Sequence, residues 1–492
     1  MRHLHCAALP VAGRSGIGGE TGLICPVLPT WVGPLAQAFE AAGHPLWIVG
    51  GFVRNALMGL PEKTDIDCTG AALPAQAAAI ARQAGYQAVS KHPTLGTLCI
   101  SNNDGMLEYT PFRTESYPAG GAHRPLEVQF TDSLPLDAQR RDFTINAIYA
   151  HARTGELQDP LAGIPDIEHR RLRACSDAHI TLKDDALRIL RMARLAGELR
   201  FEPEHALIEA AREFACQLDD LSPARIQGEL RRICLADGMY PAQSPAGHMK
   251  ALRILEACGA LRILLAELYE GTGMRQNPLY HHYDVFEHNL HAYQAAPCRI
   301  TLRLAALLHD VGKPAAYAQG GNMHGHERIG AQMAQQILQR LGFDRKTTQA
   351  VCMLIARHMF DLDGRAKVST VRTRFAQWGF EFAQDLIALR KSDIDGSGTT
   401  PSQGQTVEKW TAILQTMREE GAIDSMADMQ ITGEQIMACC HVPSGPAVGQ
   451  IKKRLFVQCA LRPHLNRPEQ LKREAIRLAR SLGYTDAAQK DG

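Results

Sequence analysis

Two neighbouring stretches predict the fold of the N-terminal part of the chain: Trp47-Ile-Val-Gly-Gly-Phe-Val-Arg54 and, shortly after it, Asp65-Ile-Asp67. The first is an apolar strand that runs through two glycines into a helix. Glycines at such a turn let backbone N–H groups approach a phosphate, and a helix N-terminus favours negative charge. The stretch therefore predicts α/β structure with a phosphate site at Gly50 and Gly51, to which Arg54 adds a charged fork.

Asp65 and Asp67 predict a metal site. Residues i and i+2 of an extended strand face the same side, so the two carboxylates converge. Hard oxygen ligands arranged this way suit Mg²⁺ bound jointly with substrate phosphates. Two such ions activate an attacking hydroxyl and stabilise a leaving pyrophosphate. Glu108, in the strand-like stretch Met106 to Thr110, is the candidate third carboxylate; the alternative is a surface glutamate on an edge strand.

Composition narrows the class of protein. The 492 residues are 45% hydrophobic and 21% charged, and the formal net charge is +1. That length favours roughly two to four domains in a soluble globular protein, and no apolar run approaches the ~18 residues of a membrane span. Thirteen unpatterned cysteines favour a reducing compartment, and hence a cytoplasmic location. A polyanionic partner would require locally concentrated positive charge.

The order of predicted elements gives an α+β architecture. Helices are expected at Val32–Ala42 and Leu73–Gly85, with strands at Leu46–Val49, Thr97–Ile100 and Met106–Thr110. From Thr144 onward the pattern is almost wholly helical. We therefore expect a small α/β head followed by a long all-α body. A Gly/Ser/Pro-rich stretch, Gly396 to Gln405, is expected to be a linker or long loop.

The stretch Lys183 to Arg188 is a candidate base-reading element. On one helix, Asp184 and Asp185 would lie beside Arg188 at i+4 and i+3 spacing. Such a pair is usually a structural salt bridge. It also forms an acceptor–donor template that fits cytosine and adenine but not guanine and uracil. Eight basic and four acidic residues lie between Arg170 and Arg200, either as a polyanion contact or as a solvated helix face.

Adjacent His309 and Asp310 end an apolar helix that Gly312 and Pro314 terminate. Two polar, metal-competent side chains beside a buried face are costly unless they are satisfied. A divalent metal would satisfy them, which predicts a second metal site far from the first.

The stretches Trp47–Gly59, Asp65–Asp67 and Arg140–Ala147 closely resemble the class II tRNA nucleotidyltransferases (CCA-adding enzymes) and the bacterial poly(A) polymerases. This resemblance implies a nucleotidyltransferase head whose Asp65 and Asp67 hold Mg²⁺. It also implies that Gly51 and Arg54 contact the triphosphate, that Arg141 contacts the nucleotide, and that Asp142 belongs to the same flexible catalytic motif.

Lys183–Arg188 resembles the family's nucleotide-selecting motif Glu-Asp-x-x-Arg. Asp185 and Arg188 match it, which implies that they read the base. Asp184 replaces the family's Glu with a shorter side chain, so its role stays open. Arg191 resembles a second nucleotide or phosphate contact.

The histidine-rich region resembles the HD superfamily of metal-dependent phosphohydrolases. His309 and Asp310 match its doublet, and the resemblance implies further ligands at His288, Asp393, His326 and His358. It suggests phosphatase or 2′,3′-cyclic phosphodiesterase activity. The substrate is not indicated, and Mg²⁺, Mn²⁺, Ni²⁺ and iron all stay open as the metal.

Five segments are therefore expected: an extension at 1–30, the nucleotidyltransferase head at 31–165, a helical neck and body at 166–272, an HD-type domain at 273–400, and a helical tail at 401–492. In the tail, a basic helix from Pro468 to Leu482 is a candidate RNA contact or an ordinary solvated helix. Its basic residues are Lys472, Arg473, Arg477 and Arg480.

The predicted activity is addition of C, C and A from CTP and ATP to the 3′ end of tRNA. Poly(A) synthesis and addition of C alone or A alone are the alternatives. The expected cofactors are Mg²⁺ at the head and an unidentified divalent metal at the HD site. The expected partners are tRNA, ATP and CTP, without a membrane.

Overall fold

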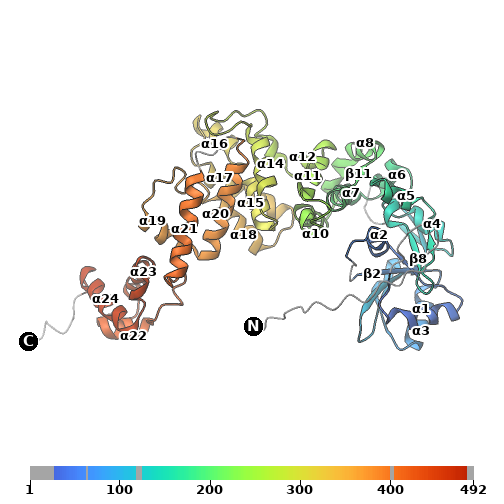
Figure 1. The fold of residues 1–492 in the computed structure, drawn as a ribbon, viewed down its shortest axis with the longest axis horizontal. Helices are drawn as coiled ribbons and strands as arrows, with labels where there is room; N and C mark the ends of the chain where they lie inside the picture. Colours follow the sequence, from blue (N-terminus) through green and yellow to red (C-terminus); the bar gives the residue numbers. More distant parts are fainter. Residues whose placement is uncertain (1–26, 62–64, 118–124, 399–403, 485–492) are drawn as a thin grey trace, which may run out of the picture. The chain divides into compact units, whose positions relative to one another are not determined.

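The computed structural model describes residues 27–61, 65–117, 125–398 and 404–484 (Figure 1). Its contacts divide the chain into an N-terminal unit, residues 1–185 with 202–207, and a C-terminal unit, residues 186–201 with 208–492. Most of the extension expected at 1–30 lies outside the described residues. The predicted fold class, an α/β head followed by a long helical body, is confirmed.

A seven-stranded mixed sheet, in the order β3-β4-β5-β2-β1-β8-β9, forms the N-terminal unit. Its strands are β1 (Trp47–Val49), β2 (Ile66–Gly70), β3 (Gln87–His92), β4 (Thr97–Ser101), β5 (Met106–Pro111), β8 (Tyr149–His151) and β9 (Leu157–Gln158). Strands β2 and β5 pair in parallel, and the other neighbours pair antiparallel. Two smaller ribbons accompany it: β6 (Arg113–Ser116) with β7 (Glu127–Phe130), and β10 (Arg171–Leu172) with β11 (Glu202–Pro203).

The expectation of almost pure helix after Thr144 is wrong for the next few dozen residues. Strand β8 completes the hydrogen bonding of β1, and β9 follows it. These strands are two or three residues long. Strands that short carry too few residues for an alternating pattern, so pairing of β8 with β1 and of β9 with β8 decides their structure.

One face of the sheet packs on α1 (Val32–Ala41) and α3 (Pro74–Gln83). Alternation along each strand sends Ile48, Cys68 and Tyr109 into this apolar core, where Phe39 of α1 lies against Tyr109. The intervening residues project from the opposite face. The core thus leaves that second face for the polar side chains of β2 and β5.

Shorter helices complete the N-terminal unit: α2 (Gly51–Leu57), α4 (Leu134–Gln139), α5 (Gly163–Glu168) and α6 (Ala178–Asp184), with 3₁₀ turns η1 (Pro93–Leu95) and η2 (Thr144–Asn146). Helix α6 ends at Asp184, Asp185 is extended with φ −147°, and α7 begins at Leu187. The single helix expected across Lys183–Arg188 is therefore wrong. Paired aspartates favour a helix end because their side chains compete for backbone hydrogen bonds.

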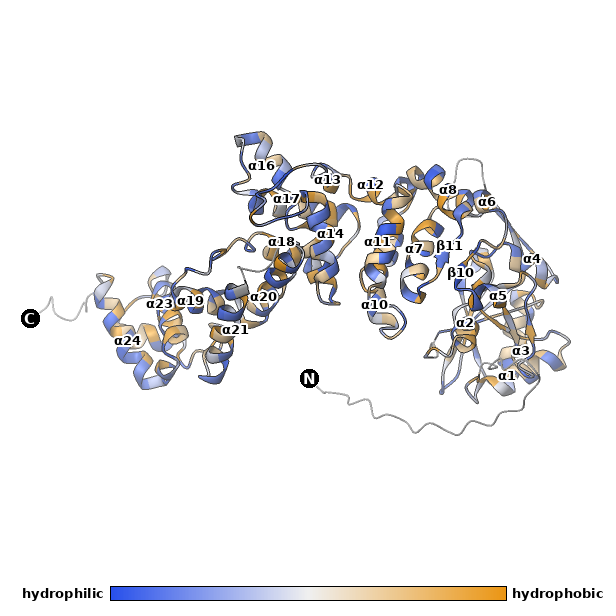
Figure 2. Ribbon diagram, turned by 45° about the horizontal axis from the view of Figure 1, so that its top comes forward, coloured by the Kyte–Doolittle hydropathy of each residue, from blue (hydrophilic) through white to orange (hydrophobic). Residues whose placement is uncertain are grey.

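Within the described residues, the C-terminal unit is helical. Its helices are α7 (Leu187–Leu199), α8 (His205–Phe214, which begins in the N-terminal unit), α9 (Pro223–Cys234), α10 (Ala236–Met239), α11 (Gly247–Ala257), α12 (Ala260–Leu264), α13 (Ala266–Tyr269), α14 (Val285–Ala295), α15 (Ile300–Leu308), α16 (Lys313–Gly320), α17 (His326–Arg340), α18 (Arg345–Ile355), α19 (Val368–Trp378), α20 (Phe380–Asp395), α21 (Gly404–Glu419), α22 (Gly433–Cys440), α23 (Pro446–Leu461) and α24 (Pro468–Ser481), with 3₁₀ turns η3 (Ala215–Asp220) and η4 (Pro463–Leu465). Figure 2 shows hydrophobic and hydrophilic residues interleaved along these helices, as expected of amphipathic segments.

No helix among the described residues is both long enough and apolar enough to cross a membrane.

Candidate active site and metal centre

Two of the three predicted carboxylates of the head, Asp67 and Glu108, lie side by side on the open face of the sheet. Asp67 of β2 pairs directly with Glu108 of β5 in parallel register, so both side chains project from one face. Asp65 lies just before β2 and is exposed, as is Asp67. Strand β5 lies between β4 and β2, so the edge-strand alternative for Glu108 is wrong. This set of hard oxygen donors fits Mg²⁺.

Gly50 places the Gly50–Gly51 turn against Asp67. Its φ of +82° is one that side chains disfavour, and a Cβ atom at Gly50 would lie 3.3 Å from Asp67 Oδ2. Helix α2 starts at the next residue, Gly51, with Gly50 as its N-cap. The glycine pair therefore brings the start of a helix beside the acidic face.

Lys91, which the sequence analysis missed, forms an ion pair with Glu108. It lies on β3, where the register shifts between Ser90 and His92. The hydrogen bond from Lys91 to Glu108 raises the pKa of the lysine. Because β3 was not recognised in the sequence, nothing indicated that Lys91 reaches this face.

Arg54 is buried, and its guanidinium donates hydrogen bonds to protein side chains, whereas the sequence predicted a contact with a phosphate. Its Nη1 donates to Asn146 Oδ1 at 2.6 Å and its Nη2 to Asn55 Oδ1 at 2.8 Å. Asn146 in turn donates to Asp142 Oδ1 at 3.2 Å. Asp142 also accepts from the backbone N–H of Phe143 at 2.8 Å. These bonds join the Gly-Gly-x-x-Arg turn to the Arg140–Ala147 motif, which were separate stretches in the sequence.

Asp137, also missed in the sequence, anchors the two arginines of that motif. Arg141 donates to Asp137 Oδ2 at 2.8 Å and Arg140 to Asp137 Oδ1 at 2.8 Å. Tyr149 donates to the same carboxylate at 2.8 Å, and the Arg141 guanidinium lies 5.3 Å from the centre of the Tyr149 ring. Asp137 precedes the arginines by three and four residues, a spacing that marks helical ion pairs. Without a predicted helix there, that signal was not used.

Replacing Asp137 by asparagine is expected to lower the free energy of unfolding by about 3 kcal/mol at neutral pH, because the largely buried Arg141 guanidinium loses its carboxylate partner and Arg140 loses one of its two, keeping Glu115. Burial raises the pKa of Asp137, but Arg141, Arg140 and Tyr149 outweigh it and lower the pKa from 3.8 to about 2. The stability that these contacts add is therefore complete above an ordinary aspartate pKa and is lost as the pH falls through the lowered one. Urea unfolding should show the difference between wild type and variant shrinking from pH 4 to pH 2 (about two pKa units).

A difference that stays constant over this pH range would contradict the assignment. Asp132→Asn is the matched control in the same unit, because Asp132 is exposed. The control is expected to change stability by less than about 0.5 kcal/mol.

Several basic residues of the 170–200 segment are neutralised inside their own unit. In the N-terminal unit, Arg171 and Arg173 donate to the buried Asp166 at 2.7 and 3.0 Å. In the C-terminal unit, Arg194 is buried and donates to Glu198 at 3.0 Å, with Glu229 as a second partner. Acidic neighbours therefore offset part of the positive charge that this segment carries. Arg188 and Arg191 on α7 remain partly exposed.

The six predicted ligands of the second metal site converge from separate elements of the C-terminal unit. They are His288 on α14, His309 and Asp310 after α15, His326 at the start of α17, His358 after α18, and Asp393 on α20. All six residues are buried. We call them the HD centre.

The HD centre consists of two ligand groups. His288, His309 and Asp393 form the first, and Asp310, His326 and His358 form the second, with the ligand atoms of each group within 4.8 Å of one another. Within the first group, His288 Nε2 lies 3.1 Å from His309 Nε2 and 3.1 Å from Asp393 Oδ1.

Asp310 connects the two groups. Its Oδ2 lies 3.5 Å from His288 Nε2 and 3.4 Å from His309 Nε2. Its Oδ1 lies 3.1 Å from His326 Nε2 and 3.7 Å from His358 Nε2. A carboxylate that turns one oxygen toward each group is the arrangement needed to bridge two metal ions.

Backbone carbonyls orient the histidine rings. The Nδ1 atoms of His309, His326 and His358 lie 2.8, 2.8 and 2.7 Å from the carbonyl oxygens three residues earlier in the chain. His288 Nδ1 lies 3.3 Å from the carbonyl of Gly396. A carbonyl at Nδ1 favours the proton on that nitrogen and leaves Nε2 as a metal ligand. All four histidines therefore present Nε2 to the centre, which fits a divalent metal.

The electrostatics favour ionised carboxylates. Burial raises the pKa of Asp310, but His309 and Lys313 outweigh it and hold the pKa well below its usual range. A cavity of about 480 Å³ opens onto the centre, and Lys313 and Arg390 line it. Buried carboxylates beside cations in a cleft are typical of a functional site.

Comparison with known proteins gives two matched regions. The Poly A polymerase head domain matches residues 46–173, and the HD domain matches residues 289–395. An A-adding tRNA nucleotidyltransferase of Deinococcus radiodurans is 30% identical over 84% of this chain and 91% of its own length. The chain belongs to the tRNA nucleotidyltransferase family. A CCA-adding enzyme of Lacticaseibacillus paracasei is 36% identical over 41% of this chain and 48% of its own length.

Solved structures of this family share the fold. The CCA-adding enzyme of Bacillus stearothermophilus in complex with CTP has a TM-score of 0.65 at 21% identity, over 93% of this chain and 99% of that one. The Thermotoga maritima CCA-adding enzyme complexed with tRNA_CCA has a TM-score of 0.56 at 15% identity, over 92% and 97%. The resemblance stated from the motifs is therefore confirmed for the fold and the family.

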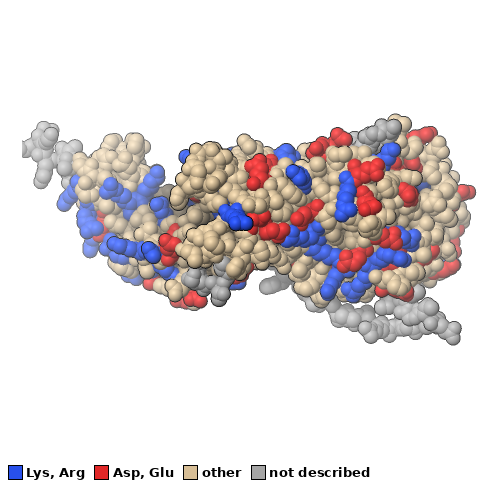
Figure 3. All heavy atoms as spheres, turned by 90° about the horizontal axis from the view of Figure 1, so that it is seen from above, with Lys and Arg blue, Asp and Glu red and all other residues tan. Residues whose placement is uncertain are grey.

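In this tRNA nucleotidyltransferase, positive charge collects near the C-terminus. Residues 446–484 contain the basic residues Lys452, Lys453, Arg454, Arg462, Arg467, Lys472, Arg473, Arg477 and Arg480 and the acidic residues Glu469 and Glu474. Figure 3 shows the resulting cluster of Lys and Arg at the left of the view, with few acidic residues nearby. Leu471, Ala475 and Leu478 bury the other face of α24, so the helix is anchored and presents its charges outward.

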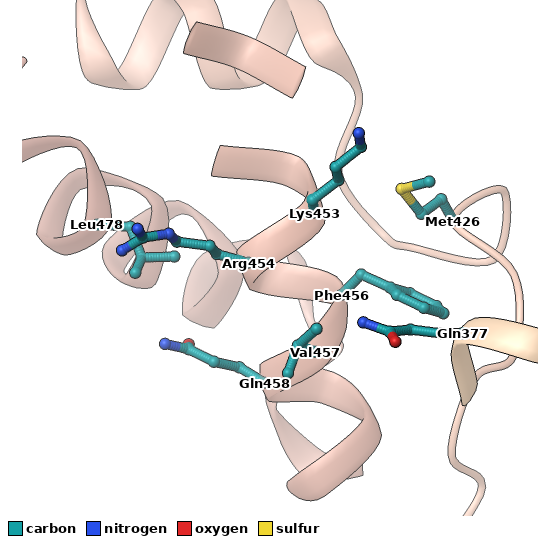
Figure 4. Close-up of a pocket in the computed structure, with 8 residues that line it drawn as sticks. All are labelled: Gln377, Met426, Lys453, Arg454, Phe456, Val457, Gln458 and Leu478. Carbon is teal, nitrogen blue, oxygen red and sulfur yellow. The ribbon is translucent and has the colours of Figure 1, made fainter. Parts of the chain in front are cut away.

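A hollow of about 580 Å³ adjoins these charges in the C-terminal unit. It is lined by Gln377, Met426, Lys453, Arg454, Phe456, Val457, Gln458 and Leu478. Figure 4 shows Lys453 and Arg454 leaving α23 in different directions, with the Phe456 ring directed toward Gln377 and Met426. The lining thus combines apolar side chains with two basic ones, Lys453 and Arg454.

Proposed function

We propose that this protein adds C, C and A from CTP and ATP to the 3′ end of tRNA. The observation that carries the proposal is the convergence of Asp67 and Glu108 with the Gly50 turn on one open sheet face. Its support from known proteins is membership of the tRNA nucleotidyltransferase family.

In the proposed reaction, the 3′-hydroxyl oxygen of the RNA forms a bond with the α-phosphorus while the bond from that phosphorus to the bridging oxygen breaks. Pyrophosphate leaves and the hydroxyl proton passes to solvent. Asp65, Asp67 and Glu108 would hold Mg²⁺, which when bound stabilises negative charge on the attacking and leaving oxygens. Gly50 and Gly51 would offer backbone N–H groups to the triphosphate.

The Arg140–Ala147 motif would hold the nucleotide. Asp137 fixes the orientation of Arg141, and Arg54 fixes Asn146 beside Asp142. This network keeps the motif in place before substrate binds, which reduces the entropy lost on binding.

We propose that Asp185 and Arg188 select the base. A carboxylate acceptor beside a guanidinium donor complements the donor–acceptor edge that cytosine and adenine share. Because α6 ends at Asp184 and α7 begins at Leu187, this proposal rests on the resemblance to the family motif and not on the spacing within one helix. Arg191 is a further nucleotide or phosphate contact in this proposal, and Asp184 keeps no assigned role.

We propose metal-dependent phosphoester hydrolysis as the activity of the HD centre. Divalent metals there would polarise a phosphate ester and activate a water nucleophile. Lys313 and Arg390 line the cavity and would attract an anionic substrate. A 2′,3′-cyclic phosphate at an RNA end is the substrate class that suits this chemistry.

The basic surface of residues 446–484 would bind tRNA phosphates. Lys472 and Arg477 make exposed ion pairs with Glu469 and Glu474, and such surface pairs are worth little and exchange readily for phosphate contacts. The division into head, neck and body, HD-type domain and tail, and the cytoplasmic location, stay predictions.

Addition of A alone is the second candidate, because the relative matched over most of its length is an A-adding enzyme. Primer extension with Mg²⁺ separates the two. The substrates are tRNA transcripts lacking CCA or ending in CC, and an unstructured RNA of equal length. CTP and ATP are supplied separately and together.

We expect two additions to the first transcript with CTP alone, a third when ATP is also present, and little extension of the unstructured RNA. Extension confined to the CC-ended transcript with ATP would make the protein an A-adding enzyme. Long A tails on every RNA would indicate a poly(A) polymerase and overturn the tRNA-specific proposal.

A further inference from the structure

The orientation of one ligand in the HD centre depends on a buried arginine. Asp393 turns Oδ1 toward His288, while its Oδ2 accepts a hydrogen bond from Arg390 Nη1 at 2.7 Å. Arg390 is 2% exposed, and its Nη2 donates to the backbone carbonyl of Leu362 at 3.2 Å. The position of Leu362 therefore limits where Arg390, and with it Asp393, can lie.

Leu362 belongs to a tight loop between α18 and α19, residues 361–366. Asp361 has a left-handed φ of +48°, and its Oδ1 accepts from the backbone N–H of Ala366 at 2.6 Å. Leu362 and Asp363 line the cavity at the HD centre. The loop is thus both a wall of the cavity and a support for Arg390.

Helix α21 holds this loop from the other side. Lys409 Nζ donates to the carbonyls of Gly364 and Ala366 at 2.6 Å each, and lies 3.6 Å from Asp361 Oδ2. Trp410 Nε1 donates to the same Oδ2 atom at 3.1 Å. Lys409 therefore donates to two backbone carbonyls of the loop, and Trp410 donates to its Asp361 carboxylate.

The anchor is rigid because it is buried. Trp410 is fully buried and stacks on Phe360 at a centroid distance of 5.5 Å, with Phe375 edge-on at 5.9 Å. Gly364 packs against Thr406 of α21 so closely that a Cβ atom would lie 2.9 Å from its Oγ1. Close-packed aromatic contacts of this kind transmit displacement instead of absorbing it.

We propose that Lys409 and Trp410 are positioning residues of the HD centre. They hold the 361–366 loop, the loop holds Arg390, and Arg390 orients Asp393. The proposal rests on metal binding at the HD centre, as put forward above. It extends that centre's functional unit to α21, beyond residue 395, where the HD-domain match ends, and beyond residue 400, where the predicted HD-type domain ends.

The test is Mn²⁺ binding to the full-length protein, measured by electron paramagnetic resonance titration. Asp65 and Asp67 are both replaced by alanine in every sample, so that the head carboxylates do not contribute. In Lys409→Met we expect the affinity of one Mn²⁺ to fall about tenfold, as on losing an outer contact of a metal ligand. The second Mn²⁺, at Asp310, His326 and His358, should keep its affinity.

Two further variants sharpen the result. Lys367→Met is the matched control, because Lys367 lies just after the same loop but is exposed; it should bind both ions as the parent does. Trp410→Phe keeps a ring but removes the N–H donor, and should weaken the same single site by a smaller factor.

Unchanged binding of both ions in Lys409→Met would overturn the proposal while leaving the HD centre's metal binding intact. Equal weakening of both sites with a lowered melting temperature would also overturn it, because that pattern indicates general destabilisation. A parent protein that binds no Mn²⁺ at the HD centre would overturn both this inference and the proposed hydrolytic function.

Discussion

The Asp67→Ala variant is expected to lose nucleotide addition by roughly 10³-fold or more in kcat/KM. Asp67 lies at the centre of the acidic face, between the Gly50 turn and Glu108. Its removal takes away a carboxylate proposed to hold Mg²⁺, which would be worth several kcal/mol of transition-state stabilisation, and each 1.36 kcal/mol is a factor of ten in rate. Primer extension on a tRNA transcript lacking CCA measures the effect.

The matched control is Asp104→Ala, an exposed aspartate of the same unit near the β4–β5 turn. It should extend the transcript at close to the wild-type rate. Asp67→Ala should keep the melting temperature and the HD-centre Mn²⁺ of the wild type, because its side chain is exposed. An Asp67→Ala protein that extends tRNA normally would refute the assignment of the head as the catalytic unit.

Asp310→Asn is expected to have the second large effect: loss of HD-centre metal and a fall of roughly 10³-fold in hydrolysis of a 2′,3′-cyclic nucleotide. Because Asp310 turns one oxygen toward each ligand group, the substitution should weaken both Mn²⁺ sites. His288→Ala should weaken chiefly the first. The comparison of the two variants by Mn²⁺ titration therefore tests the bridging role directly.

Asp363→Asn is the control here, since Asp363 lines the same cavity but is exposed. It should retain both Mn²⁺ ions. Asp310→Asn also leaves Lys313 without its carboxylate partner, so retained tRNA extension and an unaltered far-UV spectrum are needed to show that the fold survives. If the hydrolysis rate of Asp310→Asn equals that of the wild type, the HD centre is not the hydrolytic site.

Local patterns were sufficient to locate both candidate sites. The Asp65–Asp67 spacing predicts two carboxylates on one side of a strand, because side chains alternate along a strand; in the structure Asp67 lies in β2 and Asp65 directly precedes it. The Gly50–Gly51 turn follows from the same kind of local rule. His309 and Asp310 were marked by polarity at the end of an apolar helix, which burial makes costly without a partner.

The supporting residues are harder to find in this way, although the spacing of Asp137 before Arg140 and Arg141 is a local signal of a helical ion pair. Asp137 acquires its role through Arg140, Arg141 and Tyr149, and Lys91 acquires its role only through the pairing of β3 with β4. Each is an ordinary charged residue until pairing and packing bring its partners to it. At Asp185 the opposite happened. The sequence predicted one helix across Lys183–Arg188, and the structure has two helices separated at Asp185.

What the sequence determined by itself is the chemistry: which residues can hold metal, phosphate or base, and the order of an α/β head and a helical body. The tertiary structure decided which residues become neighbours of these. It places Glu108 beside Asp67, Asp310 between two ligand groups, and α21 against the loop that supports Arg390 and Asp393. The physical reason is the sequence separation over which each effect acts. Strand alternation and helix termini act over a few residues, whereas these contacts join segments tens of residues apart that meet only through packing of the core.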